Sequence, residues 1–147
     1  MVWMMVSVRQ MTIEDVPVAR VLLSQLGYPL DIQEVGFRYQ AVTKSEDHSL
    51  LVAEQAGRVI AFCHLYLRPA LDKPPEAVVQ ALVVDQAVRG SGVGKIVMAA
   101  VEARVRDRGF ASVSLASSVT RDEAHAFYEA IGYERFATSH LFRKTWK

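Results

Sequence analysis

The sequence feature that most constrains the fold is an apolar segment that leads through a glycine-rich turn into a helical pattern. Residues 77–84 are almost all apolar, which predicts a central strand buried on both faces. Residues 89–94 read Arg-Gly-Ser-Gly-Val-Gly, and apolar residues then recur at helical spacing to about residue 108. Glycines at the start of a helix expose backbone N–H groups at the positive end of the helix dipole. The turn therefore predicts a binding site for an anion.

The spacing of this turn excludes two familiar phosphate-binding loops. A P-loop needs Gly-Lys followed by Ser or Thr, but Gly94-Lys95 is followed by Ile96. A dinucleotide fingerprint needs a further glycine three positions after the second, where Lys95 or Val97 stands. The alternative is a strand-to-helix turn that binds nothing. Lys95 favours a ligand, because a positive charge in the first turn opposes the helix dipole and a bound anion would offset that cost.

Strands and helices alternate along the rest of the chain, which predicts an α/β layer structure. Thr12 is expected to cap the first helix, and Thr120 with Glu123 to form a capping box at the last. A hairpin turn is expected at Ala56-Gly57. The expected strands are 3–9, 50–54, 59–67, 77–84 and 112–116, with a closing hairpin of 133–136 and 139–145, and the expected helices are 12–26, 31–43, 93–108 and 120–131.

Composition and charge exclude several classes of function. A length of 147 residues suits one domain, 1–147, and a formal charge of +1 argues against a nucleic-acid partner. Cys63 is the single cysteine, which excludes an internal disulfide framework and a multi-cysteine metal site. No pair of histidines has metal-ligand spacing, so no metal is expected. The apolar segment 1–8 is too short to span a membrane, and no apolar run reaches about 18 residues. We therefore expect a soluble, cytoplasmic protein without a membrane partner.

Two segments resemble sequence blocks of the GNAT family of N-acetyltransferases. Residues 89–94 match the family's acyl-CoA loop, Gln/Arg-x-x-Gly-x-Gly/Ala. Residues 124–133, Ala-His-Ala-Phe-Tyr-Glu-Ala-Ile-Gly-Tyr, match its block Ala-x-x-Phe-Tyr-x-x-x-Gly-Phe/Tyr. The blocks occur in the family's order, with one helix and one strand between them, and the resemblance covers essentially the whole chain. It implies a single-domain fold with a mixed, mostly antiparallel central sheet, splayed central strands and about four flanking helices.

The resemblance also implies a function and a site. The family binds acetyl-CoA and transfers its acetyl group to an amine, here expected to be a primary amine in a ternary complex. Leu82, Val83 and Val84 match the strand that pairs with the pantetheine arm, and Tyr128 matches the tyrosine that protonates the departing thiolate. The backbone amides that would surround the pyrophosphate are those of Arg89, Gly90, Ser91, Gly92, Val93, Gly94 and Lys95. An unperturbed tyrosine is protonated at neutral pH and can act as a general acid; the alternative is a core aromatic beside Phe127.

Two positions depart from the family pattern. Arg121 stands where many relatives have an asparagine, and we expect it to contact a cofactor phosphate or the end of the helix. Gln80 stands where relatives often place a glutamate base, and an amide cannot take up a proton at neutral pH. Glu76 and Asp85 are the nearest carboxylates in the sequence, and water could relay the proton. No residue is assigned as the general base.

These departures keep other functions open. One alternative is a catalytically weak acyl-CoA-binding or regulatory module, and another is a phosphate-binding protein unrelated to CoA. His64 and His125 are expected to be hydrogen-bonded packing residues, and Cys63 a small buried hydrophobe.

The acceptor amine and the oligomeric state stay open in the sequence. By resemblance, the region of the first two helices shapes the acceptor pocket, and its candidate lining residues are Tyr28, Phe37, Arg38 and Tyr39, with 68–75 as a further wall. Packing within the helices is the alternative role for these side chains. A homodimer is expected, because closing strands leave exposed sheet edges.

Overall fold

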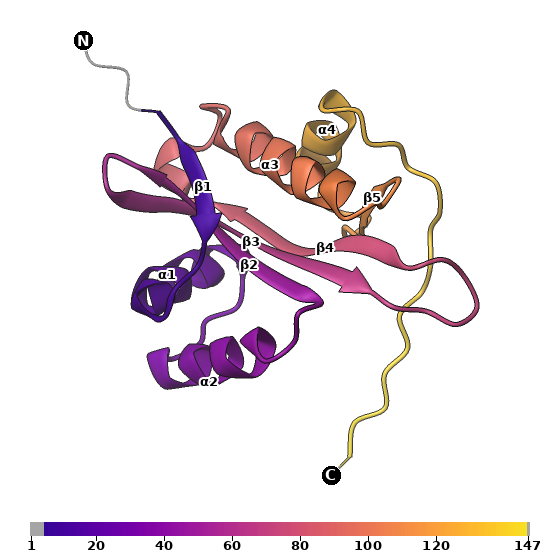
Figure 1. The fold of residues 1–147 in the computed structure, drawn as a ribbon, viewed down its shortest axis with the longest axis horizontal. Helices are drawn as coiled ribbons and strands as arrows, with labels where there is room; N and C mark the ends of the chain where they lie inside the picture. Colours follow the sequence, from indigo (N-terminus) through magenta and orange to yellow (C-terminus); the bar gives the residue numbers. More distant parts are fainter. Residues whose placement is uncertain (1–4, 147) are drawn as a thin grey trace. The chain divides into compact units, whose positions relative to one another are not determined.

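The computed structural model describes residues 5–146 and divides the chain into two compact units, one up to Ala116 and one from Ser117. The first unit holds a five-stranded sheet in the order β1-β2-β3-β4-β5 (Figure 1). Its strands are β1 (Ser7–Gln10), β2 (His48–Gln55), β3 (Arg58–Arg68), β4 (Glu76–Val84) and β5 (Val113–Leu115). Neighbouring strands are antiparallel except β4 and β5, which are parallel. The predicted α/β class and mixed, mostly antiparallel sheet are confirmed. Residues 3 and 4 of the predicted first strand lie outside the described residues.

Helices cover both faces of this sheet. α1 (Val16–Leu26) and α2 (Ile32–Thr43) lie on one face, and α3 (Val93–Asp107) lies on the other (Figure 1). Successive residues of a strand point to opposite faces. On β2, Leu50 and Val52 accordingly join the core cluster that includes Leu22 of α1, while the alternate residue Leu51 is equally inaccessible at 1% exposure. The nearly continuous apolar runs of the central strands therefore follow from burial on both faces.

The predicted turn and cap residues occupy the conformations that their chemistry favours. Gly27 ends α1 with φ 111°, a left-handed conformation that glycine adopts without strain. Asp31 begins α2, and its carboxylate accepts a hydrogen bond from the Glu34 backbone N–H at 2.8 Å. The predicted hairpin turn at Ala56-Gly57 joins β2 to β3, with φ of 53° and 74°.

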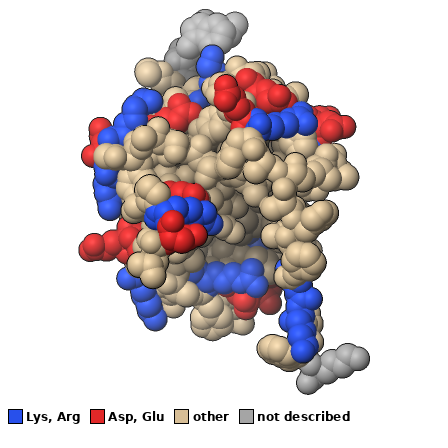
Figure 2. Space-filling view, turned by 90° about the vertical axis from the view of Figure 1, so that its right-hand side faces the viewer, with Lys and Arg blue, Asp and Glu red and all other residues tan. Residues whose placement is uncertain are grey.

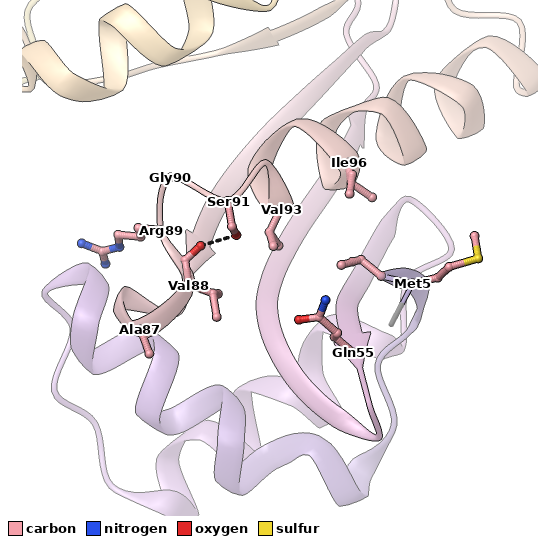
Figure 3. Close-up of a pocket in the computed structure, with 10 residues that line it drawn as sticks. Met5, Gln55, Ala87, Val88, Arg89, Gly90, Ser91, Val93 and Ile96 are labelled. Carbon is pink, nitrogen blue, oxygen red and sulfur yellow. Dashed lines mark hydrogen bonds between the residues drawn. The ribbon is translucent and has the colours of Figure 1, made fainter. Parts of the chain in front are cut away.

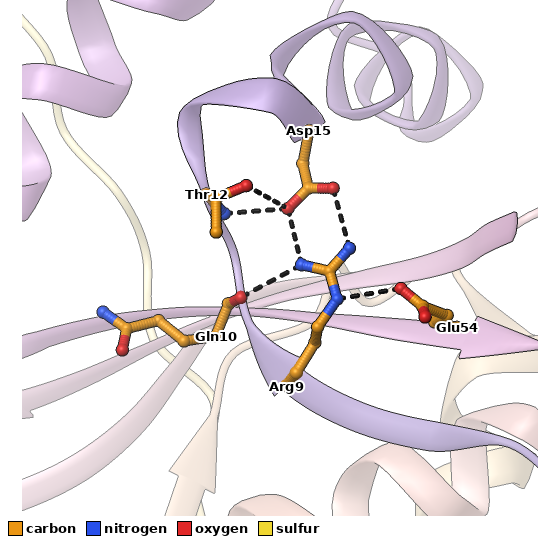
Figure 4. A network of polar contacts seen from close by, with 5 residues as sticks. All are labelled: Arg9, Gln10, Thr12, Asp15 and Glu54. Atoms are coloured by element: carbon orange, nitrogen blue, oxygen red, sulfur yellow. Dashed lines mark hydrogen bonds and ion pairs between the residues drawn. The ribbon is translucent and has the colours of Figure 1, made fainter. Parts of the chain in front are cut away.

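The turn from β1 into α1 is closed by an ion-pair network (Figure 4). A short 3₁₀ helix, η1 (Ile13–Asp15), follows Thr12. The Asp15 carboxylate accepts two guanidinium hydrogen bonds from Arg9, at 2.8 and 2.9 Å, and one from the Thr12 backbone N–H at 2.8 Å. Arg9 Nε donates to Glu54 at 2.8 Å. Asp15 is only 6% exposed, and these partners satisfy its charge.

The second unit contains α4 (Asp122–Ala130), which Gly132 follows with φ 99°. The predicted capping box at this helix is wrong. Arg121 is the N-terminal cap and makes no side-chain capping bond, while Thr120 Oγ1 lies 3.1 Å from Ser118 Oγ. Thr120 thus lies one residue too early, and a neighbouring hydroxyl takes its hydrogen bond.

The predicted closing strands, 133–136 and 139–145, are also wrong. Residues 133–146 contain neither helix nor strand, so the observed sheet stays open at β5. A strand pattern alone does not make a strand, because the backbone N–H and C=O groups need a neighbouring strand to bond with.

Candidate active site

The central strand β4 has a neighbour on both sides for only part of its length. Toward β5 it pairs through Ala77–Val79 with Val113–Leu115, whereas toward β3 the pairing continues to Val84, opposite Ala61. Within the described sheet, residues 80–84 therefore have an open edge on the β5 side. The pairing with β3 shifts by one residue at Gln80, so a bulge lies where β5 ends. This divergence is the expected splay of the central strands.

The open edge presents the backbone of particular residues. The Asp85 N–H donates to the Ile60 carbonyl of β3 at 2.8 Å. Because backbone groups alternate between the two edges of a strand, Val83 also faces β3, and Leu82 and Val84 face the open side. The Arg89 Nε atom donates to the Val84 carbonyl at 3.0 Å, in agreement with that direction. Of the three predicted pantetheine-binding residues, Leu82 and Val84 thus face the open side, where the Val84 carbonyl is already bonded to Arg89, while Val83 packs in the core at 3% exposure.

The segment that follows β4 is tied to α1. Asp85 caps a short 3₁₀ helix, η2 (Gln86–Val88), and its carboxylate accepts the Ala87 N–H at 3.1 Å. Gln25 of α1 donates to Asp85 at 3.3 Å and accepts the Gln86 N–H at 2.8 Å. Hydrogen bonding to Ala87 is the main factor that lowers the pKa of Asp85. Asp85 is therefore a structural carboxylate of this turn and a weak proton acceptor.

The glycine-rich turn begins α3 with open backbone donors. Gly90 and Gly92 have φ of 82° and 91°, and Gly92 is the N-terminal cap residue. Added Cβ atoms would meet open space at both positions, so glycine is favoured here by the backbone conformation. The Ile96 N–H donates back to the Gly92 carbonyl at 3.2 Å. The N–H groups of residues 93–95 precede the first such bond and have no acceptor inside the helix.

A cavity of about 660 Å³ lies beside this turn (Figure 3). Residues 87–91 of the turn line it, together with Val93, Ile96 and Gln55. The Ser91 hydroxyl donates to the Val88 carbonyl across the turn, while the Arg89 side chain points away from the cavity (Figure 3). Lys95 is exposed in the first turn of α3. The predicted loop residues are therefore brought together at one helix N-terminus.

Tyr128 and Arg121 belong to the second unit and lie on α4. The Tyr128 ring packs edge-on against Phe127 and Tyr133, at centroid distances of 5.1 and 5.9 Å. The Tyr133 N–H donates to the Tyr128 carbonyl at 2.9 Å, which fixes the end of the helix. Arg121 is exposed at the start of α4. His125 also lies on this helix, with Nε2 2.8 Å from the Ser118 carbonyl.

The two carboxylates considered as proton acceptors are both stabilised in the ionised form. Glu76 pairs with Lys73 at 3.2 Å and with Arg68, and the Lys73 contact is the main cause that lowers the Glu76 pKa. Neither Glu76 nor Asp85 therefore has a pKa that is raised toward neutrality.

A histidine pair that the sequence analysis missed lies on β2 and β3. His48 Nδ1 and His64 Nε2 are 2.8 Å apart, and the His48 ring stacks on Tyr66 at 4.2 Å. Burial is the main cause that lowers the pKa of His64 to about 4, so this imidazole is neutral at neutral pH. The residues are far apart in sequence but adjacent through the pairing of His48 with Tyr66. Two histidines at the same face of paired strands are the signal that would have found them.

Other expectations can be compared with the described residues directly. Cys63 is fully buried, and burial raises its pKa to about 12, as a small hydrophobic side chain would show. None of the helices described is long and apolar enough to cross a membrane. Figure 2 shows Lys and Arg interspersed with Asp and Glu on the face that it draws.

Comparison with known proteins agrees with this geometry. Residues 17–133 match the model of the acetyltransferase (GNAT) family. An uncharacterized N-acetyltransferase of Bacillus subtilis (strain 168), YhdJ, is 29% identical over 84% of this chain and 86% of its own. The aminoglycoside N(6′)-acetyltransferase type 1 of Stenotrophomonas maltophilia is 29% identical over 71% of each chain. The structure of aminoglycoside N-acetyltransferase AAC(6′)-Iy in complex with CoA has a TM-score of 0.87 and 20% identity, and covers 97% of this chain and 96% of that one.

The likeness to that structure shows that this chain has the same fold. The family match covers most of the chain, and the chain belongs to the GNAT family of acetyltransferases. Acetyl-CoA is the co-substrate of this family. The expected family, fold class and co-substrate are thereby confirmed.

Proposed function

We propose that this protein transfers the acetyl group of acetyl-CoA directly to a primary amine while both substrates are bound. The observation that carries the proposal is the open edge of β4, followed through η2 and the glycine-rich turn by a start of α3 that no side chain caps. The family match spans residues 17–133 and so extends from the first compact unit into the second, which supports one N-acetyltransferase domain over residues 1–147. The proposal places this activity in the cytoplasm.

The cofactor would bind mainly through backbone groups of the first unit. The amide-rich pantetheine arm can add to the open edge of β4 at Leu82 and at the Val84 N–H, as a further strand would, while the Val84 carbonyl is bonded to Arg89. The N–H groups from Arg89 to Lys95 are proposed to surround the pyrophosphate, because the helix dipole acts together with the donors of residues 93–95, which have no acceptor inside the helix. The Ser91 N–H, which donates to the Val88 carbonyl at 3.3 Å, would have to share or exchange that bond. We assign Arg121 to a phosphate of the same cofactor, as a charge-assisted contact.

The reaction forms a C–N bond and breaks the C–S bond of the thioester. A neutral amine attacks the carbonyl carbon, and the leaving thiolate takes a proton from the Tyr128 hydroxyl. The proton lost by the amine passes to water, because Gln80 cannot accept it and the Glu76 and Asp85 carboxylates are stabilised in the ionised form. Tyr128 recovers its proton from solvent after CoA leaves.

We propose an amino sugar of the aminoglycoside class as the acceptor. The Stenotrophomonas relative that acts on such compounds matches this chain over 71% of both lengths. An acceptor panel should include an aminoglycoside with a 6′-amino group and its 6′-hydroxyl counterpart. Thiol release with the first compound alone supports the assignment. Release with neither, but with another primary amine, would retain the transferase and reject the acceptor class.

The test of the mechanism is Tyr128→Phe, compared with Tyr133→Phe in the neighbouring ring. Loss of a general acid lowers kcat by about 10²- to 10⁴-fold where chemistry limits the rate. Acetyl-CoA affinity should stay nearly unchanged in Tyr128→Phe, and kcat should stay nearly unchanged in Tyr133→Phe. Normal turnover of Tyr128→Phe at saturating substrates would remove Tyr128 from the mechanism. Acetyl-CoA binding without turnover of any amine by the unaltered protein would instead indicate a binding or regulatory module.

A further inference from the structure

His48 and His64 form a pair on β2 and β3 that the proposed mechanism does not yet use. His48 Nδ1 lies 2.8 Å from His64 Nε2, and the His48 ring lies parallel to the Tyr66 ring, with a centroid distance of 4.2 Å and an interplanar angle of 3°. At this separation one ring nitrogen donates a hydrogen bond and the other accepts it. The stack orients one imidazole, and the hydrogen bond aligns the second with it. Two imidazoles joined in this way can pass a proton from one to the other.

Strand pairing places His64 beside the bulge of β4. His64 is the cross-strand partner of Leu50 on β2 and of Ala81 on β4, and paired residues point to the same face of a sheet. Leu50 belongs to the core cluster that includes Leu22 of α1, and Ala81 packs against that cluster. His64 therefore lies on the α1 and α2 face of the sheet, next to the point where the open edge of β4 begins.

The opposite face of the sheet is covered at this point. α3 packs against β3 and β4, and Leu65 and Val79, which pair across these two strands, are 2% and 5% exposed. An amine that reaches the end of the open edge therefore approaches from the histidine face. A pantetheine arm that runs along the edge past Leu82 brings its thioester to Gln80 and Ala81, because one residue of a strand spans about 3.3 Å.

The distance from the thioester to the histidine pair suits a transfer through water. Two strand spacings, about 10 Å, separate β3 from an arm bound at the open edge. On this face the β4 residue opposite His64 is Ala81, whose side chain is a single methyl group. The amine and intervening water can fill the gap, so a proton can move from the amine to His64 along hydrogen bonds.

Burial and the neighbouring imidazole determine the charge of His64. Burial is the main cause that lowers its pKa to about 4, and the charge of His48 is the second cause. Further along β3 and β4, the Glu76 carboxylate pairs with Arg68 and, at 3.2 Å, with Lys73. His64 is therefore uncharged at neutral pH, and a proton delivered to it moves on to a better solvated group.

The ionisable residues of the two helices on this face are exposed or have partners of their own. Arg20 of α1 and Lys44 at the end of α2 are exposed. Glu34 and Arg38 of α2 pair with each other at 2.9 Å, and Tyr39 packs against the core cluster. The two imidazoles are thus the groups in position to exchange a proton with the site.

We propose that His64 and His48 form a relay that removes the proton from the ammonium form of the acceptor, an inference that rests on the proposed function. Water takes the ammonium proton and gives one to His64 Nδ1, the His64 Nε2–H passes its proton to His48 Nδ1, and the His48 Nε2–H releases one to solvent. The neutral amine left in the site then attacks the thioester carbon. Because His64 gains one proton as it loses another, its buried ring holds no lasting charge. Exchange with solvent restores both tautomers before the next turnover.

The first test measures kcat/KM for the acceptor with His64→Gln and His48→Asn. Each replacement keeps a hydrogen-bonding group near the lost ring nitrogen but cannot carry a proton at neutral pH. Only about one in 10³ molecules of an alkylamine with a pKa of about 10 is neutral at about pH 7. Each variant should therefore lose about 100-fold in kcat/KM there. The loss should shrink at about pH 9.5, because more of the free amine is already neutral.

The matched control is His140→Gln, at an exposed position, and it should leave kcat/KM unchanged. Acetyl-CoA affinity should be unaltered in all three variants. A loss that is equal at both pH values would show that the pair only packs. Variants as active as the unaltered chain would overturn the relay and leave the transferase intact, whereas an unaltered protein that turns over no amine would overturn both.

The second test combines the two substitutions in one chain. Residues on a single proton path act as a unit, so the double variant should be no slower than the slower single variant. Losses that multiply would overturn the relay, because they would show two independent effects. If one single variant does not fold, the other tests the relay by itself, because both residues carry the same proton.

Discussion

Two strand-to-helix turns of the first unit differ in how they treat the backbone N–H groups at the start of a helix. Where β1 leads into α1, the Asp15 carboxylate takes the Thr12 N–H and two guanidinium bonds from Arg9. Where β4 leads into α3, the cap residue is Gly92, which has no side chain to offer. The first turn, which we call the closed turn, uses its polar groups within the fold. The second, which we call the open turn, leaves donors for another molecule.

The difference separates residues that stabilise from residues that bind. The first turn excludes solvent from a charged side chain, so changes there should lower the free energy of unfolding. The second turn is exposed from Arg89 to Gly92, so changes there should alter ligand affinity with less effect on stability. Each of the following substitutions tests one side of this contrast.

The largest expected effect is on the open turn. Gly92→Asp should weaken acetyl-CoA binding about 100-fold, because a carboxylate would occupy the free N–H groups and repel the phosphates. Calorimetry of acetyl-CoA binding measures the change. Gly109→Asp is the matched control, since Gly109 has a similar φ of 84° and equally open space near the other end of α3. Equal affinities in the two folded variants would contradict the anion-binding assignment.

A change in the closed turn should lower the free energy of unfolding. Asp15→Asn removes the charge that Arg9 faces, and the free energy of unfolding should fall by about 2 kcal/mol, the size of a hydrogen bond to a charged group. Denaturant unfolding measures this change, and acetyl-CoA affinity of the folded variant should be unaltered. The exposed Asp72→Asn should change stability by no more than about 0.5 kcal/mol. A loss of cofactor affinity in Asp15→Asn would show that the two turns are not independent.

The same pair predicts how acid affects stability. Hydrogen bonding from Arg9 is the main cause that lowers the pKa of Asp15 below its ordinary value of 3.8. As the pH falls through that value, the unfolded chain takes up a proton before the native Asp15 does, so the native state loses stability. Above about pH 5 the contribution is fully present. The stability difference between the unaltered chain and Asp15→Asn should therefore shrink between pH 5 and pH 2, and a constant difference would contradict the ion pair.

The smallest expected effect is on the support of the open turn. Gln25→Ala removes two hydrogen bonds, to Asp85 and to the Gln86 N–H, and should weaken acetyl-CoA binding about 5-fold, equivalent to about 1 kcal/mol. Gln33→Ala, at an exposed position of α2, should leave affinity unchanged. Unchanged binding in Gln25→Ala would show that the turn holds its shape without this tether.

The sequence predicts the open turn well because its signals are local. A buried strand, glycines and a helical repeat are adjacent along the chain, and each element's end is marked by a residue such as Gly27 or Asp31. The closed turn was recognised only in part, because Arg9 and Glu54 meet through sheet pairing and not through sequence proximity.

The failures that involve strands have a shared physical cause. His48 and His64 become neighbours only once the register of β2 and β3 is known. Residues 133–146 have the pattern of two strands, yet they form none, since pairing depends on a partner edge that a pattern does not specify. The Gln80 bulge likewise arises from the pairing of β3 with β4. Local chemistry predicted most elements and their ends, although the capping box expected at Thr120 was wrong, while relations between distant strands required the structure.

The burial of Cys63 has a practical consequence for following turnover. It is the single sulfhydryl of the protein, it is completely inaccessible, and burial raises its pKa to about 12. Thiol reagents attack the thiolate, so the native protein should give almost no background colour with a chromogenic disulfide. Any signal that grows with time then reports free CoA, and a sudden rise without substrate reports unfolding. One reagent can thus monitor both catalysis and the integrity of the sheet.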